Sequence, residues 1–297
     1  MTRSIWMSIV VGLACAAPAQ AARNGRIVVE TRFQGQSAFV SPRLISVRPD
    51  GGGRRLLGTG LFPSATRDGR LVYDRYCGRC SASRRLRLVV ARADGRVVRR
   101  IRIARSSAYP NAPDWPSLSP DGRWLAYGRA AAGRPDAEVC IARANGKAER
   151  VVATFSDGTL AASWSPDGRY LAVASGVRGL LVINARTGRV RVVYRGDAAG
   201  RPAFSPDGHT LLFVAPAASH EQDEVESVQL DGTGLRYLFP GDSPFWSPDG
   251  RLIGAVASDP ASAQAKTEII IRRPTGHVVT QFAMEGREAT WLPAARS

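Results

Sequence analysis

The 297-residue sequence is poor in cysteine, histidine and lysine. It has four cysteines and three histidines, and two of its 41 basic residues, Lys147 and Lys266, are lysines. It also lacks a Gly-x-Ser-x-Gly elbow and a Gly-x-x-x-x-Gly-Lys loop, which argues against a serine hydrolase domain and a P-loop nucleotide site. So few imidazoles and thiols leave little from which to build a metal centre. We therefore expect no catalytic residues, no metal and no cofactor.

Long apolar runs are also missing after the N-terminal region. The chain opens with a basic residue, an apolar run over residues 5–16 and the small residues Ala19-Gln20-Ala21. This arrangement is typical of a signal peptide cleaved after Ala21, and the run is short for a permanent transmembrane helix. We expect residues 1–21 to be a signal peptide and residues 22–297 to form one domain, periplasmic or secreted, with no transmembrane segment after cleavage.

The cysteines fall in three places. Cys77-Gly78-Arg79-Cys80 has CxxC spacing, and in an exported chain a local disulfide between Cys77 and Cys80 is favoured. A zinc site would need a second ligand pair, and a thioredoxin-like motif would need a βαβ setting; both are missing. Cys140 lies in a strand-like segment and is predicted to be a buried free thiol. Cys15 belongs to the signal peptide, although a lipid anchor there is an alternative reading.

Acidic residues are scarce relative to basic ones. The chain carries 41 Lys and Arg against 25 Asp and Glu, a formal charge of +16. Such a surplus favours acidic partners such as anionic lipid, acidic wall polymers or polysaccharide. The arginines are scattered rather than clustered, so a generally basic solvated surface is the competing interpretation, and we expect no nucleic-acid partner.

A short sequence motif recurs along the chain. Ser-Pro-Asp-Gly stands intact at 119–122, 165–168, 205–208 and 247–250, with a degenerate copy at 66–69. Proline presets the first corner of a type I turn, and glycine supplies the left-handed residue that closes a bulged hairpin. An aromatic or leucine precedes the intact turns, and an apolar residue follows all five. Self-similarity at about 40 to 50 residues indicates a propeller or solenoid.

The register of the repeat predicts closure into a ring. Extending it backwards reaches Asn24-Gly25-Arg26, which copies the second half of the hairpin, and extending it forwards reaches Trp291, in the first half. The two ends of the chain together make one unit, which brings the count to six. A second hairpin, with turns such as Asp94-Gly95, follows each first one. The sequence thus predicts an all-β, six-bladed propeller of four-stranded antiparallel blades, in which N- and C-terminal strands share one blade.

Proline and the residues before the turns place the strands within each blade. Proline stands five residues before the turn Asp at positions 63, 116, 202 and 244. Because proline cannot donate to a β-ladder, it belongs on a strand with a free edge, and the innermost strand has one. The residue just before each turn, such as Trp164 or Trp246, should then pack between adjacent blades.

The segment Pro-x-Trp-Ser-Pro-Asp-Gly-Arg, as at 244–251, resembles the repeat of the TolB-type, WD-like β-propellers. The resemblance covers residues 24 to 293. It implies a six-bladed, often exported propeller whose members commonly bind protein or peptide partners at one end of the channel. TolB itself carries an α/β domain before its propeller, whereas here the repeats begin almost at the predicted cleavage site.

Candidate binding residues come from the longer loops on the face opposite the turns, where variable segments are expected to lie. They are the following set: Tyr76, Arg79, Tyr109, Trp115, His220, Glu221 and Asp223. The histidines are spread over different faces and do not converge. We expect a monomeric, non-enzymatic propeller that binds a protein, peptide or envelope-associated partner at one rim of its channel. The alternative is a metal-assisted enzyme acting on carbohydrates or lactones.

Overall fold

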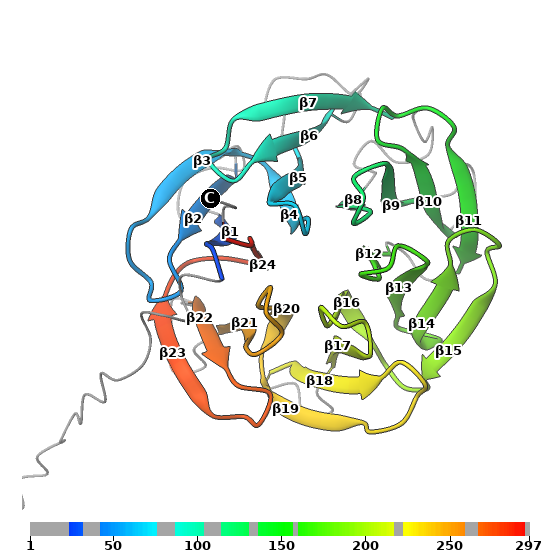
Figure 1. The fold of residues 1–297 in the computed structure, drawn as a ribbon. Helices are drawn as coiled ribbons and strands as arrows, with labels where there is room; N and C mark the ends of the chain where they lie inside the picture. The colour runs from blue at the N-terminus through cyan, green and yellow to red at the C-terminus, as the bar shows by residue number, and fades with distance from the viewer. Residues whose placement is uncertain are drawn as a thin grey trace, which may run out of the picture.

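The computed structural model describes residues 24–31, 42–75, 87–103, 114–130, 136–156, 160–216, 222–258 and 267–294. Within these ranges every regular element is a β-strand, and the strands form six four-stranded antiparallel sheets arranged in a ring (Figure 1). No helix in the described part of the chain is long and apolar enough to span a membrane. The prediction of a six-bladed propeller is confirmed.

Each blade, numbered from 1, contributes one strand to each of four concentric positions. The innermost strands are β24 (Glu288–Trp291), β4 (Leu61–Ala65), β8 (Asp114–Leu118), β12 (Ala162–Trp164), β16 (Ala199–Phe204) and β20 (Asp242–Trp246). The second strands are β1 (Ile27–Thr31), β5 (Arg70–Asp74), β9 (Trp124–Ala130), β13 (Tyr170–Ser175), β17 (Thr210–Ala215) and β21 (Ile253–Ser258). The third strands are β2 (Arg43–Val47), β6 (Arg87–Arg92), β10 (Ala137–Arg143), β14 (Gly179–Asn184), β18 (Glu224–Gln229) and β22 (Thr267–Arg272). The outermost strands are β3 (Arg55–Thr59), β7 (Val97–Arg102), β11 (Arg150–Phe155), β15 (Val190–Tyr194), β19 (Arg236–Pro240) and β23 (Val278–Ala283).

Blade 1 closes the ring as the sequence predicts. The C-terminal strand β24 pairs with β1, placing Trp291 opposite Ile27. The Trp291 indole donates to the Asn24 carbonyl at 2.9 Å, and its ring packs edge-on against Phe245 of blade 6, 6.1 Å between centroids. The two ends of the chain therefore join blades 6 and 1.

The hairpin turns lie at one end of the ring, called the turn face; the opposite end is the loop face. In the blade 4 turn, the Ser165 hydroxyl donates to Asp167 at 2.5 Å and accepts from the Tyr170 amide at 2.9 Å. Gly168 takes a φ of +70°. The same hydroxyl contacts recur at Ser119, Ser205 and Ser247, which explains why the turn repeats with serine first.

The core consists of six apolar clusters, one between each pair of adjacent blades. Trp164 of blade 4 lies in the cluster shared with blade 3 and donates to the Ser117 carbonyl at 3.1 Å. Trp246 of blade 6 reaches the Ala203 carbonyl of blade 5 at 3.3 Å. The predicted packing of these aromatics between blades is confirmed.

Arginine side chains also tie neighbouring blades together. In three successive blade pairs, an arginine on or near the start of the outer strand donates to a carbonyl in the second hairpin turn of the next blade. These bonds are Arg99 to Ala144 at 3.3 Å, Arg150 to Ala185, and Arg191 to Leu230 at 2.6 Å. Part of the arginine content is therefore structural, and a guanidinium with five donors suits this role better than a lysine ammonium.

Candidate functional site: the central channel

Four innermost strands enter the channel from the loop face through a bulge. The pairing register shifts near the start of β4, β8, β16 and β20. Near each shift one residue takes a left-handed backbone: Phe62 at +53°, Trp115 at +52°, Gly200 at +67° and Ser243 at +50°. A left-handed non-glycine residue costs roughly 1–3 kcal/mol, and a bulge re-aims nearby side chains. Three such costs at equivalent positions around one channel favour a role for this part of the molecule beyond folding.

Two aromatic residues at the loop-face end of the channel hold carboxylates. The rings of Phe62 and Trp115, from neighbouring blades, lie 4.7 Å apart between centroids. The Trp115 indole donates to Glu288 Oε1 at 3.1 Å, and the Phe62 amide donates to Glu30 Oε2 at 2.8 Å. Blades 2 and 3 thus meet here through a ring contact, and each is joined to blade 1 by a hydrogen bond to a carboxylate.

Arg201 crosses the channel. It lies on β16 of blade 5, and its Nη1 donates at 3.0 Å to the carbonyl of Pro63 on β4 of blade 2, on the opposite side of the ring (Figure 1). Its Nε and Nη2 atoms are buried and have no hydrogen-bond partner among the described residues. Burial lowers the pKa of Arg201, while the carboxylates of Glu288 and Glu30 oppose that shift.

The acidic groups beside Arg201 are poorly hydrated. Burial, together with the charges of Asp242 and Glu30, raises the pKa of Glu288 to about 7, although Arg201 and the Trp115 hydrogen bond act against this. The pKa of Asp242 is also raised, chiefly by loss of hydration within the channel and further by Asp223. Glu288 can therefore gain or lose a proton near neutral pH.

A cavity of about 240 Å³ occupies the turn-face side of the channel. Arg201 lines its inner end, and none of Phe62, Trp115 or Glu288 reaches it, so Arg201 forms its floor. The walls are aromatic, apolar and hydroxyl side chains of the innermost strands. Its mouth is lined by the second residue of each first-hairpin turn: Arg67, Pro120, Pro166, Pro206, Pro248 and Pro293. We call these six residues the collar.

A scan against protein families supplies the deciding comparison. Residues 64–289 match the model of the TolB beta propeller domain, and this match spans most of the chain. The chain belongs to the TolB β-propeller family. The resemblance inferred from the repeat is thereby confirmed.

Solved structures extend the TolB comparison. TolB from Acinetobacter baumannii is 19% identical with a TM-score of 0.72, covering 91% of this chain and 67% of that one. A chain of a nidogen/laminin complex is 12% identical with a TM-score of 0.61, and the match covers 91% of this chain and 99% of that one. An oligogalacturonate lyase from Vibrio parahaemolyticus is 10% identical with a TM-score of 0.53, and the match covers 88% of this chain and 79% of that one. At these identities the likeness concerns the fold.

Two of the residues predicted for binding lie at the loop-face end of this TolB-like channel. Trp115 is on an innermost strand and contacts Phe62 and Glu288, while Asp223 acts electrostatically on Asp242. The other predicted positions lie outside the described residues: Tyr76, Arg79, Tyr109, His220, Glu221 and the cysteines Cys77 and Cys80. Cys140 is a buried free thiol, as predicted, and burial raises its pKa to about 12. Among the described residues, no group of three His, Cys, Asp or Glu could hold a metal ion.

Glu288 gives the TolB-like channel a pH-dependent stability. Its pKa in the folded state lies above the ordinary value of 4.5, so folding takes up a proton between pH 4.5 and about 7. Its contribution to stability is therefore greatest below that window and is lost as pH rises through it, by on the order of 2 kcal/mol. Between pH 5 and pH 8 the wild type should lose thermal stability relative to Glu288→Gln, measured by circular dichroism. Parallel profiles for the two proteins would contradict this assignment.

Proposed function

We propose that this chain is a non-enzymatic binding protein of the cell envelope whose channel cavity receives an extended segment of a protein partner. The observation that carries this proposal is the cavity, which opens at the collar and is closed at its inner end by Arg201. Its width is set by six strand ends, which suits a single extended chain rather than a folded domain. The predicted signal peptide and the TolB family support a location outside the cytoplasm.

The walls of the cavity suit a peptide. Proline rings and aromatic side chains such as Trp164, Phe245 and Trp246 offer apolar surface. Serine and threonine hydroxyls of the innermost strands lie between them and can hydrogen-bond a peptide backbone. Apolar surface with a few placed polar groups is the usual composition of a ligand site. Residues predicted at the loop face remain a second, separate candidate surface.

Panning a library of linear dodecapeptides against the purified protein tests the proposal. We expect enrichment of peptides whose affinity, measured by fluorescence polarisation, falls at least tenfold in Ser64→Trp. Ser64 lines the cavity, so an indole there blocks it. The matched control is Val177→Trp, at a surface position that is 76% exposed. Absence of enriched peptides, or equal binding by the two variants, would contradict the proposal.

A further inference from the structure

The cavity carries positive charge that no acidic side chain balances from its walls. Its lining includes two arginines, Arg67 in the collar and Arg201 at the floor, and no Asp, Glu, Lys or His. Arg67 is exposed, and within the described part of the chain it makes no hydrogen bond or ion pair. An arginine thus lines each end of the cavity.

The floor guanidinium has donors in a geometry that suits a carboxylate. Nη1 donates to Pro63, and the two guanidinium nitrogens without a partner among the described residues are Nε and Nη2, which lie side by side on one edge of the guanidinium plane. Two parallel N–H groups match the two oxygens of a carboxylate. A buried donor without a partner destabilises the folded protein, so a carboxylate that reaches this edge would recover that loss.

Around the mouth, the strand ends next to the turns are basic, although an Asp follows the collar residue in each first-hairpin turn of blades 2 to 6. At the turn face, the strand residues next to the turns include seven arginines and no Asp or Glu: Arg55, Arg70, Arg92, Arg143, Arg150, Arg236 and Arg272. At the loop face, the corresponding strand ends include five acidic residues, Asp74, Asp114, Glu224, Asp242 and Glu288, and three arginines, Arg43, Arg87 and Arg102. The strand ends are therefore more basic at the turn face, where the cavity opens, than at the loop face.

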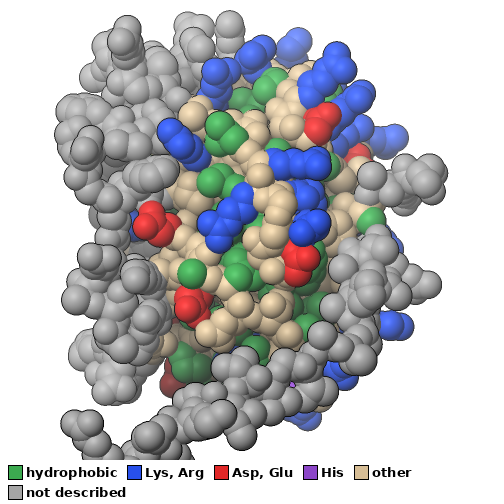
Figure 2. Space-filling view, turned by 90° about the vertical axis from the view of Figure 1, so that its left-hand side faces the viewer, with side chains coloured by type: hydrophobic (Ala, Val, Ile, Leu, Met, Phe, Trp, Pro, Cys, Tyr) green, Lys and Arg blue, Asp and Glu red, His purple; other side chains and the backbone are tan. Residues whose placement is uncertain are grey.

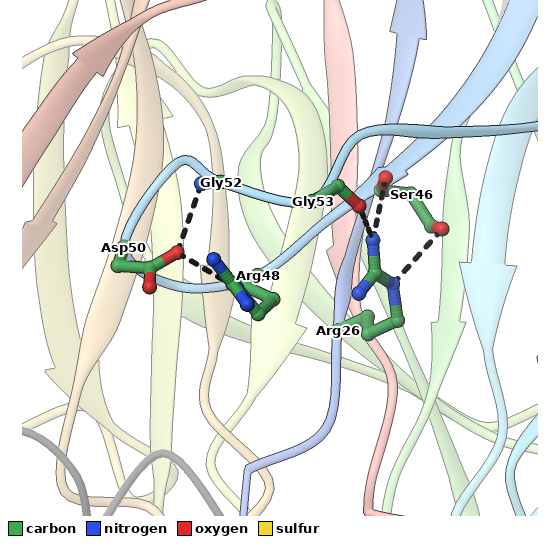
Figure 3. A network of polar contacts seen from close by, with 6 residues as sticks. All are labelled: Arg26, Ser46, Arg48, Asp50, Gly52 and Gly53. Atoms are coloured by element: carbon green, nitrogen blue, oxygen red, sulfur yellow. Dashed lines mark hydrogen bonds and ion pairs between the residues drawn. The ribbon is translucent and has the colours of Figure 1, made fainter.

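In blade 1, hydrogen bonds fix the position of one further turn-face arginine, Arg26. The Arg26 guanidinium donates to the hydroxyl and carbonyl of Ser46, both at 3.0 Å, and to the Gly53 carbonyl (Figure 3). Burial and the neighbouring charges of Arg55 and Arg48 lower its pKa. Lys and Arg side chains also outweigh acidic ones on this side of the molecule (Figure 2). Such crowding of like charges is relieved by an anionic partner.

We infer that the segment received by the cavity is acidic and places a carboxylate against Arg201, with a second acidic group near Arg67. This inference rests on the proposed function and names the chemistry of its partner. The carboxylate comes either from a side chain within the segment or from a free C-terminus, since both present the same two oxygens. The basic turn face would also speed the encounter, because opposite charges steer association.

The peptides enriched by panning provide the test. We expect Asp or Glu to be over-represented in them, and affinity to weaken between 50 and 300 mM NaCl. Each peptide is then compared with two neutralised forms, one with its acidic side chains changed to amides and one with an amidated C-terminus. The form that loses about tenfold in affinity, equivalent to about 1.4 kcal/mol, identifies the source of the carboxylate.

Variants of the protein complete the test. Arg67→Gln and Arg201→Gln should each weaken binding about tenfold, whereas Arg96→Gln, an exposed arginine of an outer turn that does not line the cavity, should change it less than twofold. If Arg201→Gln does not fold, the comparison of peptide affinity between Arg67→Gln and Arg96→Gln still tests the inference. Enriched peptides without acidic bias, or equal losses in the Arg67 and Arg96 variants, would overturn the inference and leave the proposed function standing. No enriched peptides at all would overturn the proposed function instead.

Discussion

Removing β24 by truncation after Glu285 will abolish the cooperative thermal unfolding of this protein. The strand supplies the innermost ladder of blade 1, and its Ala289 and Trp291, with the adjacent Leu292, are at most 8% exposed. Losing a buried tryptophan alone costs about 3–5 kcal/mol, comparable with the total stability of about 5–15 kcal/mol typical of a domain. Without that strand, blades 6 and 1 share no complete apolar cluster, and the ring stays open.

The point variant Trp291→Ala gives the same prediction in milder form. It should lower the free energy of unfolding in urea by about 3–5 kcal/mol, because the indole packs on Phe245 and its hydrogen bond to Asn24 is lost as well. The control Val177→Ala, at a position 76% exposed, should stay within about 0.5 kcal/mol. A truncated chain that melts like the full-length protein would contradict circular closure through β24.

Gly128→Ala will destabilise the interface between blades 3 and 4 by about 3 kcal/mol, at the upper end for overpacking. Gly128 lies on β9, and a Cβ built there would stand 2.0 Å from the carbonyl oxygen of Leu160, where the chain enters blade 4. The obstacle is backbone rather than a flexible side chain, so the two blades must separate to admit a methyl group. Urea unfolding of the variant and the wild type, monitored by tryptophan fluorescence, measures the loss in the free energy of unfolding.

The chain provides a matched control for this substitution. Gly176 is exposed, its φ is not in the left-handed range, and a Cβ there would meet no described atom within 4 Å. Gly176→Ala should therefore change stability by less than about 0.5 kcal/mol. Similar stabilities for the two alanine variants would show that close approach of Gly128 to Leu160 is not required.

The architecture was predictable because each blade repeats the same local chemistry. Turns such as Ser165–Gly168 depend on residues within six positions of one another, so their recurrence can be read directly from the sequence. Proline at equivalent positions, such as Pro63 and Pro202, then identified the innermost strands. Closure followed because Trp291 stood in register with the other residues that precede a turn.

The chemistry of the channel was not predictable from the same repeat. Arg201 contacts Pro63 across the whole ring, and Trp115 contacts Glu288, which lies 173 positions further along the chain. Such contacts depend on how six blades face one another, which no local pattern specifies. One signal was available: the residues just before the inner-strand prolines, namely Phe62, Trp115, Arg201 and Ser243, differ from blade to blade although the flanking repeat does not.

The arginine residues likewise have two roles that composition alone could not distinguish. Arg150 and Arg191 bind carbonyls of the next blade and stabilise the ring. Arg67 instead lies at the cavity mouth and makes no such contact among the described residues. Position in the fold, rather than residue type, distinguishes these roles.

A crystal structure of the protein with a panned peptide tests the central claim most directly. The account predicts peptide density inside the channel, between the collar and Arg201, with a carboxylate on the Nε and Nη2 edge of that guanidinium. Peptide bound at the loop face or along an outer strand, with the cavity empty, would contradict it.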